Sequence, residues 1–457
     1  MSDPRQDSQQ SPRQDSQRNE DASSRSSQPA PPLAANKPLG WWETIGGIGP
    51  AVVVAAVVLG PGSITTASRV GTAYGYSMGW VLLITTALMI GMTLAALVVG
   101  TGSTSTAAER LRTSFGSFPT ACLGVAVFLI VALFQSSNNR ALLLAAELFV
   151  PEISDSRMLS GGLLIAFNAV IIVFFLKSRS IYRVIEKSML LLVATMLVCF
   201  GINAVVGSMD FSAAARGLIP SGESLAVVSQ QLTGDLRALV GTTFSVAGAF
   251  YQCYLVRQRG WTRDQLHRRW LDPVVGIATL GGLTLLIMST AAASLHGKID
   301  AGEITDLSSL SASLAPTFGP QAAWVFAAGI LAGAVSSFIG NALIGGTIMS
   351  DTLGKGASAE QAGPRAFTVL ALLVGMGIAL LSVLAGMDSV AFIIVAQGLT
   401  TLGLPLMAAS LAWLLWQTAP QMKPLLAIVG LGFLVSCYVA FVTLLSLLDK
   451  LQAYVGG

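Results

Sequence analysis

Histidine and charged residues are the scarcest features of this sequence. Only two histidines, His267 and His296, occur in 457 residues, and both fall in segments that we expect to be loops. A metal site built mainly from imidazoles is therefore excluded. Charged residues make up 11% of the chain and hydrophobic residues 53%, with a mean hydropathy of +0.70. This composition excludes an ordinary soluble globule and is typical of a polytopic helical membrane protein.

The cysteines and the net charge give no sign of a disulfide framework, a metal site or a nucleic-acid partner. The four cysteines lie inside apolar runs without paired spacing, which indicates free thiols and neither a disulfide framework nor a metal site. The net charge of +3 is too small to indicate a nucleic-acid partner. No Ser/His/Asp or paired-acid arrangement is visible, so we expect no enzyme and no cofactor. The cysteines are Cys122, Cys199, Cys253 and Cys437.

The first 40 residues differ from the rest of the chain. They are rich in Ser, Gln, Asp, Arg and Pro, and the short sequence Arg-Gln-Asp-Ser-Gln occurs twice, beginning at Arg5 and at Arg13. Such a composition cannot bury a core and predicts a disordered tail. The tail also lacks the apolar centre of a signal peptide, so we expect it to stay on the cytoplasmic side. We expect residues 41–457 to form one transmembrane domain.

Eleven apolar segments in this domain are long enough to span a bilayer, whose core of about 30 Å needs roughly 20 helical residues. We interpret the first ten as two five-helix repeats, at about 45–207 and 236–417, followed by an extra helix at about 424–448. The predicted spans are 46–74, 78–99, 119–147, 159–176, 185–207, 236–258, 271–295, 321–350, 366–385, 389–417 and 424–448.

Loop charges give the orientation. If the N-terminus is cytoplasmic, fourteen Lys and Arg residues fall on the inner side and five on the outer side, as the positive-inside rule requires. We therefore expect a multi-pass protein of a bacterial-type inner (plasma) membrane. The inner set is Arg110, Arg112, Lys177, Arg179, Arg183, Lys187, Arg257, Arg259, Arg263, Arg268, Arg269, Lys355, Arg365 and Lys423, and the outer set is Arg157, Arg216, Arg237, Lys298 and Lys450.

The first span is interrupted at Gly60-Pro61-Gly62-Ser63. Proline removes a backbone donor and glycine relaxes the steric limits on the backbone, so a helix should unwind here. Unwound backbone at membrane depth survives only where protein buries it or a polar cavity wets it, which makes these four residues a candidate substrate site. Ser63 is expected to cap the helix that follows. The alternative is a proline kink sealed by neighbouring helices.

The sixth span carries a comparable interruption. Small residues, among them Gly241, Ser245, Ala247 and Gly248, break its apolar run. Two interrupted spans five helices apart indicate a five-plus-five inverted repeat whose broken helices face each other near the midplane. A glycine that only lets two helices pack closely is the alternative.

Several short motifs, in order and spacing, resemble the Nramp (natural resistance-associated macrophage protein) family of divalent-metal transporters. The resemblance extends over nearly all of residues 45–448 and implies an all-α, LeuT-type fold with discontinuous helices 1 and 6. It also implies a secondary transporter that works by alternating access on a small ion. The motifs are Gly49-Pro50, Gly60-Pro61-Gly62-Ser63, Gly71-Thr72-Ala73-Tyr74-Gly75-Tyr76, Thr101-Gly102, Glu109-Arg110, Tyr182-Arg183, Gly217-Leu218-Ile219-Pro220, Ser336-Ser337, Gln397 and Leu404-Pro405.

The chain departs from the family at the metal site, which makes it a divergent member. Gly60 and Ser63 stand where the family has aspartate and asparagine, and Ser245, Val246 and Ala247 stand opposite its Met-Pro-His motif. Gln397 matches a family glutamine that can contribute to the site. Other matched positions form a pathway set: Gln252 opposite a later histidine, Ser136 and Asn139 in place of acids associated with proton movement, and Arg140, which follows them.

These substitutions leave hydroxyls, amides and carbonyls but no anion. A hydrated Mg²⁺ suits such a site better than bare Mn²⁺ or Fe²⁺, because Mg²⁺ keeps several waters. Few acids lie within the spans, so no proton carrier is evident, and we expect Asp235 only to mark the outer start of the sixth span.

The basic residues inside spans, Arg69 and Arg140, together with helix N-termini, favour instead a small anion or polar solute. Alternatively, Arg69 extends to an interface and Arg140 pairs with Glu147. A sensor that binds without transporting is a further alternative.

Overall fold

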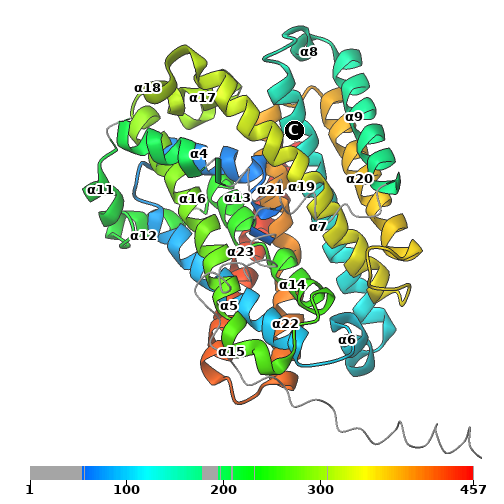
Figure 1. Ribbon diagram of the computed structural model, residues 1–457. Coiled ribbons are helices and arrows are strands. Elements are labelled where there is room, and N and C mark those ends of the chain that lie inside the picture. The colour runs from blue at the N-terminus through cyan, green and yellow to red at the C-terminus, as the bar shows by residue number, and fades with distance from the viewer. Residues whose placement is uncertain are drawn as a thin grey trace, which may run out of the picture. The chain divides into compact units, whose positions relative to one another are not determined.

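Helices account for all the regular secondary structure in the part of the chain that the structure describes. The structure is a computed structural model, and it describes residues 54–55, 57–177, 194–195, 197–206, 209–230, 232–305 and 307–455. All of these belong to one structural unit, residues 46–457, shown in Figure 1. The predicted tail, 1–40, lies outside the described residues.

Nine helical segments within those ranges are long and apolar enough to cross a membrane, and they coincide with nine of the eleven predicted spans. The other two predictions, 46–74 and 185–207, fall partly outside the described residues, where α4 and a short apolar helix, Leu197–Val206, represent them. The spanning helices are α4 (Pro61–Tyr74), α5 (Gly79–Thr101), α7 (Ser117–Ala146), α9 (Arg157–Lys177), α13 (Gly234–Thr243), α14 (Val246–Gln258), α16 (Leu271–Leu295), α19 (Ala322–Thr352), α20 (Ala362–Leu384), α21 (Ser389–Leu399), α22 (Leu404–Thr418) and α23 (Lys423–Val455).

Short helices connect these spans. One of them, α6 (Ala107–Phe115), begins with a capping box in which Thr106 and Glu109 satisfy each other's backbone N–H groups. The others are α8 (Glu152–Asp155), α11 (Phe211–Arg216), α12 (Gly222–Gln230), η2 (Arg263–Gln265), α15 (Leu266–Arg269), η3 (Ala301–Glu303), α17 (Leu307–Ser311), η4 (Ala312–Leu314), α18 (Ala315–Phe318) and η5 (Gly319–Gln321), with η6 (Thr400–Gly403) joining α21 to α22.

The packing of the helices repeats when each span is replaced by the one five places away in the chain. The first span, α4, packs on the seventh, α16, while both halves of the sixth, α13 and α14, pack on the second, α5. The third and eighth spans, α7 and α19, pack together, as do the fourth and ninth, α9 and α20. Each pairing is reproduced when every span is exchanged for the one five places away, which is the relation that an inverted five-plus-five repeat requires.

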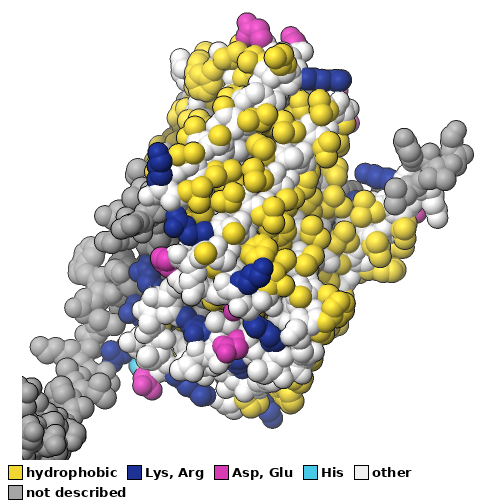
Figure 2. Space-filling model, turned by 90° about the vertical axis from the view of Figure 1, so that its right-hand side faces the viewer, with side chains coloured by type: hydrophobic (Ala, Val, Ile, Leu, Met, Phe, Trp, Pro, Cys, Tyr) yellow, Lys and Arg dark blue, Asp and Glu magenta, His cyan; other side chains and the backbone are white. Residues whose placement is uncertain are grey.

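The outer helices present apolar side chains to their surroundings. Examples are Ile165 and Val170 on α9, Leu381 on α20 and Leu434 on α23, which are between 53% and 67% exposed. Figure 2 shows apolar side chains spread over the face that carries α9 and α20, with most of the charged ones gathered toward one end. A continuous apolar surface of this kind suits contact with lipid.

Candidate functional site between the two broken helices

The first helix is interrupted at Leu59 and Gly60. Val57 and Val58 are helical, and α4 begins at Pro61 after Gly60, whose φ of −92° and ψ of −178° are extended. Pro61 fits the first position of a helix because it lacks the N–H that would be unpaired there. The predicted break is therefore confirmed, and Gly60, Pro61 and Gly62 are all buried.

Serine hydroxyls satisfy the carbonyls that this break releases. Ser63 Oγ donates to the Val58 carbonyl at 2.9 Å, and Ser337 Oγ of α19 donates to the Val57 carbonyl at 2.8 Å. The expectation that Ser63 caps the amino end of α4 was wrong. The N-cap position is Gly60, without a side-chain cap, and Ser63 instead binds backward to the preceding helix.

The sixth helix is interrupted at Phe244 and Ser245. α13 ends at Thr243, Phe244 and Ser245 have ψ values of 57° and 81°, and α14 begins at Val246. The interruption thus lies between the two predicted glycines and not at either of them. Ser245 and Ala247 are buried at the start of α14.

Glycines on these helices allow close approach of neighbouring elements. A Cβ atom at Gly241 would lie 2.7 Å from the Gln397 carbonyl oxygen, and one at Gly248 would lie 3.1 Å from Val54. Gly248 therefore lets α14 pack against the first half of the first span. Both glycines therefore have the role that the sequence analysis gave as the alternative, namely to let two helices pack closely.

Gln397 of α21 lies between the two broken helices. A side chain at Gly62 would overlap its amide, and its backbone carbonyl faces Gly241. Its Nε2 donates to Ser137 Oγ of α7 at 2.9 Å, while its Oε1 is buried with no hydrogen-bond partner among the described residues. Gln397 thus carries a buried amide oxygen between α4, just after the first break, and the last turn of α13, just before the second.

α7 contributes a buried polar run, Gln135 to Arg140, next to the first break. The members that reach the site are Ser137, through Gln397, and Asn138, whose Oδ1 lies 3.5 Å from the Cβ position of Gly60. Asn138 is itself held by Gln135 Oε1, to which its Nδ2 donates at 3.1 Å. Sequence reasoning missed both, although the uninterrupted polar run in an apolar helix was a usable signal.

The two predicted pathway residues of this run turn elsewhere. Ser136 Oγ donates to the Leu133 carbonyl of its own helix at 2.8 Å. Asn139 Nδ2 donates to the Gln135 carbonyl, and its Oδ1 accepts from Asn168 of α9 at 2.6 Å. Neither contacts a break.

Both intramembrane arginines are engaged away from the gap. Arg140 donates to the Met387 carbonyl and lies 6.0 Å from the ring centroid of Phe392, with Glu147 and Asp388 as its electrostatic neighbours. Arg69 forms an ion pair with Asp235 at 2.9 Å. Arg69 is therefore paired at the first turn of α13, and its expected extension to an interface stays a prediction.

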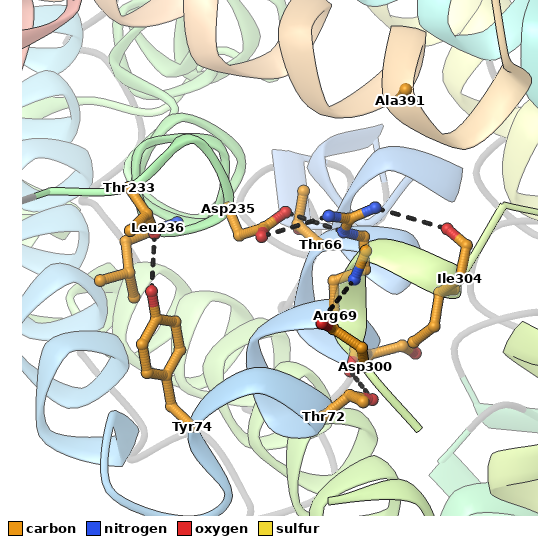
Figure 3. Close-up of polar contacts among 12 residues, drawn as sticks. Thr66, Arg69, Thr72, Tyr74, Thr233, Asp235, Leu236, Asp300, Ile304 and Ala391 are labelled. Carbon is orange, nitrogen blue, oxygen red and sulfur yellow. Dashed lines mark hydrogen bonds and ion pairs between the residues drawn. The ribbon is translucent and has the colours of Figure 1, made fainter. Parts of the chain in front are cut away.

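The Arg69–Asp235 ion pair is one of several contacts between α4 and α13, drawn in Figure 3. Arg69 also donates to the Ile304 carbonyl at 3.4 Å, and Tyr74 Oη lies 2.9 Å from Thr233 Oγ1. These contacts tie the end of α4 to the beginning of α13.

Buried acids exist on the opposite end of the sixth span. Gln252 Nε2 donates to Asp272 of α16 at 3.2 Å, and Tyr254 Oη donates to Asp351 of α19 at 2.8 Å. Both carboxylates are less than 7% exposed. The interpretation that acids are nearly absent from the spans therefore needs correction, since Asp272 and Asp351 had been overlooked near the predicted span ends.

The same end is closed by arginines. Arg110 of α6 donates to Thr418 Oγ1 at 2.8 Å, Arg112 donates to the Asp351 carbonyl at 2.7 Å, and Arg257 donates to the Thr104 carbonyl. Burial lowers the pKa of the Arg110 guanidinium from its ordinary value. Gln397 itself is 2% exposed and therefore enclosed by protein.

Comparison with known proteins identifies the family. Residues 51–449 match the family described as natural resistance-associated macrophage protein-like, Nramp. The chain belongs to the Nramp family. With its apolar helices, this makes the Nramp chain a multi-pass integral membrane protein.

Similar proteins and solved structures agree with this family assignment. A divalent metal cation transporter MntH of Listeria innocua is 25% identical over 315 residues, covering 67% of this Nramp chain and 68% of the relative. One from Granulibacter bethesdensis is 24% identical over 380 residues, covering 81% and 80%. A mutant of the Eremococcus coleocola manganese transporter matches with a TM-score of 0.74 at 16% identity, covering 93% and 91%. This likeness shows the shared LeuT-type fold.

The donor set of the Nramp chain is neutral. Within the described ranges, no group of three or more His, Cys, Asp or Glu side chains could hold a metal ion. Around the two breaks lie the amides of Gln397 and Asn138 and the hydroxyls of Ser137, Ser245 and Thr243. Such donors can replace part of a cation's hydration shell but cannot neutralise its charge.

Proposed function

We propose that the chain is a secondary-active transporter that moves a divalent metal ion across the membrane by alternating access. Membership of the Nramp family and relatives named as divalent metal cation transporters support this. The single observation that carries the proposal is the position of Gln397 between Gly62, just after the first break, and Gly241, in the last turn before the second, with its Oε1 buried without a partner among the residues described. A buried, unpaired acceptor is costly unless a ligand uses it.

The neutral donors favour a cation that keeps part of its water. The proposed contacts are Gly60 to Ser63, Ser245, Ala247, Gly248 and Gln397. Because no group of three or more acidic, histidine or cysteine side chains gathers in the described part of the chain, we expect Mg²⁺ or Mn²⁺ to bind as a hydrated ion and less tightly than at an acidic site. A small anion is not favoured, since Arg69 and Arg140, the two cations that suggested it, have other partners.

The proposed setting is the inner (plasma) membrane, with the tail and N-terminus in the cytoplasm. The distribution of Lys and Arg between the loops supports this orientation. The proposed division into repeats at about 45–207 and 236–417, with an extra helix at 424–448, is supported by the packing of the helices, which repeats when each span is replaced by the one five places away.

Uptake into proteoliposomes tests the function. The purified full chain should accumulate Mg²⁺ or Mn²⁺ against its concentration gradient when an ion gradient is imposed, and Gln397→Ala should abolish this accumulation. Asn168→Ala is a matched control, because the Asn168 amide on α9 donates to Asn139 Oδ1 on α7 and is not in contact with either break. Saturable metal binding without any accumulation would show a sensor and overturn the proposal. Accumulation of a small anion alone would overturn the choice of substrate.

A further inference from the structure

Two buried side chains of α7, Gln135 and Asn138, form a line of hydrogen bonds that begins at the backbone of α19. Gln135 Nε2 donates to the Phe338 carbonyl, and Asn138 Nδ2 donates to Gln135 Oε1 at 3.1 Å. Gln135 is 0% exposed and Asn138 is 2% exposed. We call these two side chains the α7 amide pair.

The Phe338 carbonyl fixes the direction of the amide pair. A carbonyl can only accept a hydrogen bond, so Gln135 has to turn its NH₂ group toward Phe338 and its oxygen toward Asn138. That oxygen can also only accept, so Asn138 has to present its own NH₂ group to it. Asn138 Oδ1 is therefore the atom of the pair that points away from Gln135.

The oxygen that points away lies beside the first break. Asn138 Oδ1 is 3.5 Å from the position of a Cβ atom at Gly60, the extended residue of that break. Two residues further on, a Cβ atom at Gly62 would overlap the Gln397 amide. Two amides, one from α7 and one from α21, thus lie beside the same short stretch of the first span.

The orientation of Gln397 is not fixed in the same way. Its Nε2 donates to Ser137 Oγ at 2.9 Å. A hydroxyl can also donate, so Ser137 would pair equally well with Gln397 Oε1 if the amide turned over. Asn138 has no such freedom while Gln135 is in place. Of the two amides, Asn138 is therefore the one whose oxygen is held toward the break.

Close packing keeps Gln135 in place. Gly375 of α20 approaches α7 so closely that a Cβ atom there would lie 2.3 Å from Gln135 Cβ. The bond to the Phe338 carbonyl holds the other end of the side chain against α19. These contacts belong to α19 and α20, and the contact with the first break is made by Asn138. Gln135 is thus placed to act on the site through Asn138.

We propose that Asn138 Oδ1 is a fixed ligand for the transported cation or for one of its waters, and that Gln135 is the positioning residue that keeps this oxygen, and not the NH₂ group, toward the first break. A carbonyl oxygen attracts a cation, whereas an NH₂ group attracts an anion. The pair therefore gives a site made of neutral donors a preference for cations. The proposal rests on the proposed function only for the place where the cargo binds. The alternative is a purely structural pair that joins α7 to α19.

Equilibrium binding tests the ligand without any transport. Titration calorimetry with Mn²⁺ on the purified full chain compares the parent with Asn138→Leu, Gln135→Met and the double variant. Asn138→Leu should weaken the affinity about tenfold, because one ligand is lost. Gln135→Met should weaken it about fivefold, because the hydrogen bond that orients the Asn138 amide is lost. Methionine keeps the unbranched shape that fits beside Gly375.

The double variant separates positioning from structure. If Gln135 acts through Asn138, adding Gln135→Met to Asn138→Leu should weaken the affinity no further, whereas independent effects would multiply to about fiftyfold. Asn168→Leu is the matched control. Asn168 is a 1% exposed amide of α9 that donates to Asn139 Oδ1 of α7, so this change removes a comparable contact between helices and should leave the affinity unchanged.

Three results would overturn the proposal: unchanged affinity in Asn138→Leu, a fiftyfold loss in the double variant, or a loss in Asn168→Leu equal to that in Asn138→Leu. Asn138→Ala, with the same expected loss, takes the place of Asn138→Leu if the bulkier variant does not fold. If the affinities change as expected but proteoliposomes accumulate no metal, the proposed function fails while the ligand stands. A parent that binds neither Mn²⁺ nor Mg²⁺ would overturn both.

Discussion

The two helix breaks are each two residues long but are stabilised differently. At the first, the carbonyls of Val57 and Val58 each accept a serine hydroxyl, one from α19 and one from α4 itself. At the second, Ser245 makes no side-chain cap, and the neighbouring Thr243 hydroxyl is buried with no partner in the described part of the chain. The first break is therefore held by two serine hydroxyls, one of them from another helix, whereas the second has a buried hydroxyl without a partner among the described residues.

This difference suggests a division of roles. A break whose carbonyls are satisfied internally is stable without a ligand, and its serines serve structure. Thr243 at the second break and Gln397, whose backbone faces Gly241 of the same helix, each have a buried oxygen without a partner among the described residues, so this side has more to gain from a bound ion and its waters. We expect substitutions at the first break to change mainly stability and those facing Gln397 to change mainly transport.

Among the substitutions that compare the two breaks, Gly62→Ala should have the largest effect on transport. The new Cβ would overlap the Gln397 amide, so the amide must move away from the gap. Losing one ligand costs about 1.4 kcal/mol or more, equal to about a tenfold loss of affinity. The measurement is the concentration dependence of metal uptake. Gly377→Ala, at a position in α20 with open space around it, is the control, and an equal effect at both glycines would contradict the prediction.

Ser337→Ala should destabilise the protein more than any other serine substitution at the breaks. It leaves the buried Val57 carbonyl without its partner from another helix, at a cost of about 1–3 kcal/mol. Thermal unfolding in detergent should show a lower Tm. The neighbouring Ser336→Ala should change it little, because that hydroxyl bonds only the Gly333 carbonyl of its own helix. The reverse order of the two would show that the first break is not held by α19.

Ser63→Ala should cost less, about 1 kcal/mol, because the bond to Val58 is local and the carbonyl also accepts the Gly60 N–H at 2.8 Å. The same unfolding measurement applies. A loss of Tm larger than that of Ser337→Ala would mean that the local bond, and not the contact with α19, holds the break.

Thr243→Val should have the smallest effect on stability. Its hydroxyl has no partner in the residues described, so an isosteric apolar side chain costs nearly nothing or stabilises slightly. Metal uptake should nevertheless fall if this hydroxyl contacts the ion's waters. A clearly lowered Tm would contradict the contrast between the two breaks.

Local chemistry explains what the sequence predicted well. Gly60-Pro61-Gly62 locates the first break because proline and glycine act on the backbone of their own residues. Long apolar runs located nine spans because burial in lipid constrains composition directly. The second break, at Phe244 and Ser245, contains neither residue, so it was indicated only by the small residues around it and by its position relative to the first break.

Side-chain direction and partners could not be predicted. On α7, Ser137 and Asn138 approach Gln397 and Gly60 whereas their neighbours Ser136 and Asn139 do not, because one residue turns a helix face by about 100°. The partners of Arg69 and Arg140 lie 166 and 247 residues away, and no local pattern indicates them.

Metal titration of a Gly60→Asp variant tests most directly whether the cargo lies between the two breaks. This change places a carboxylate next to Asn138 and Ser337, whose hydroxyl must move aside. Titration calorimetry on the purified full chain should then show Mn²⁺ affinity raised about tenfold or more over both the parent and the size-matched Gly60→Asn, because a carboxylate supplies the missing charge. Equal affinities in all three proteins would contradict a cation site at the meeting point of the two broken helices.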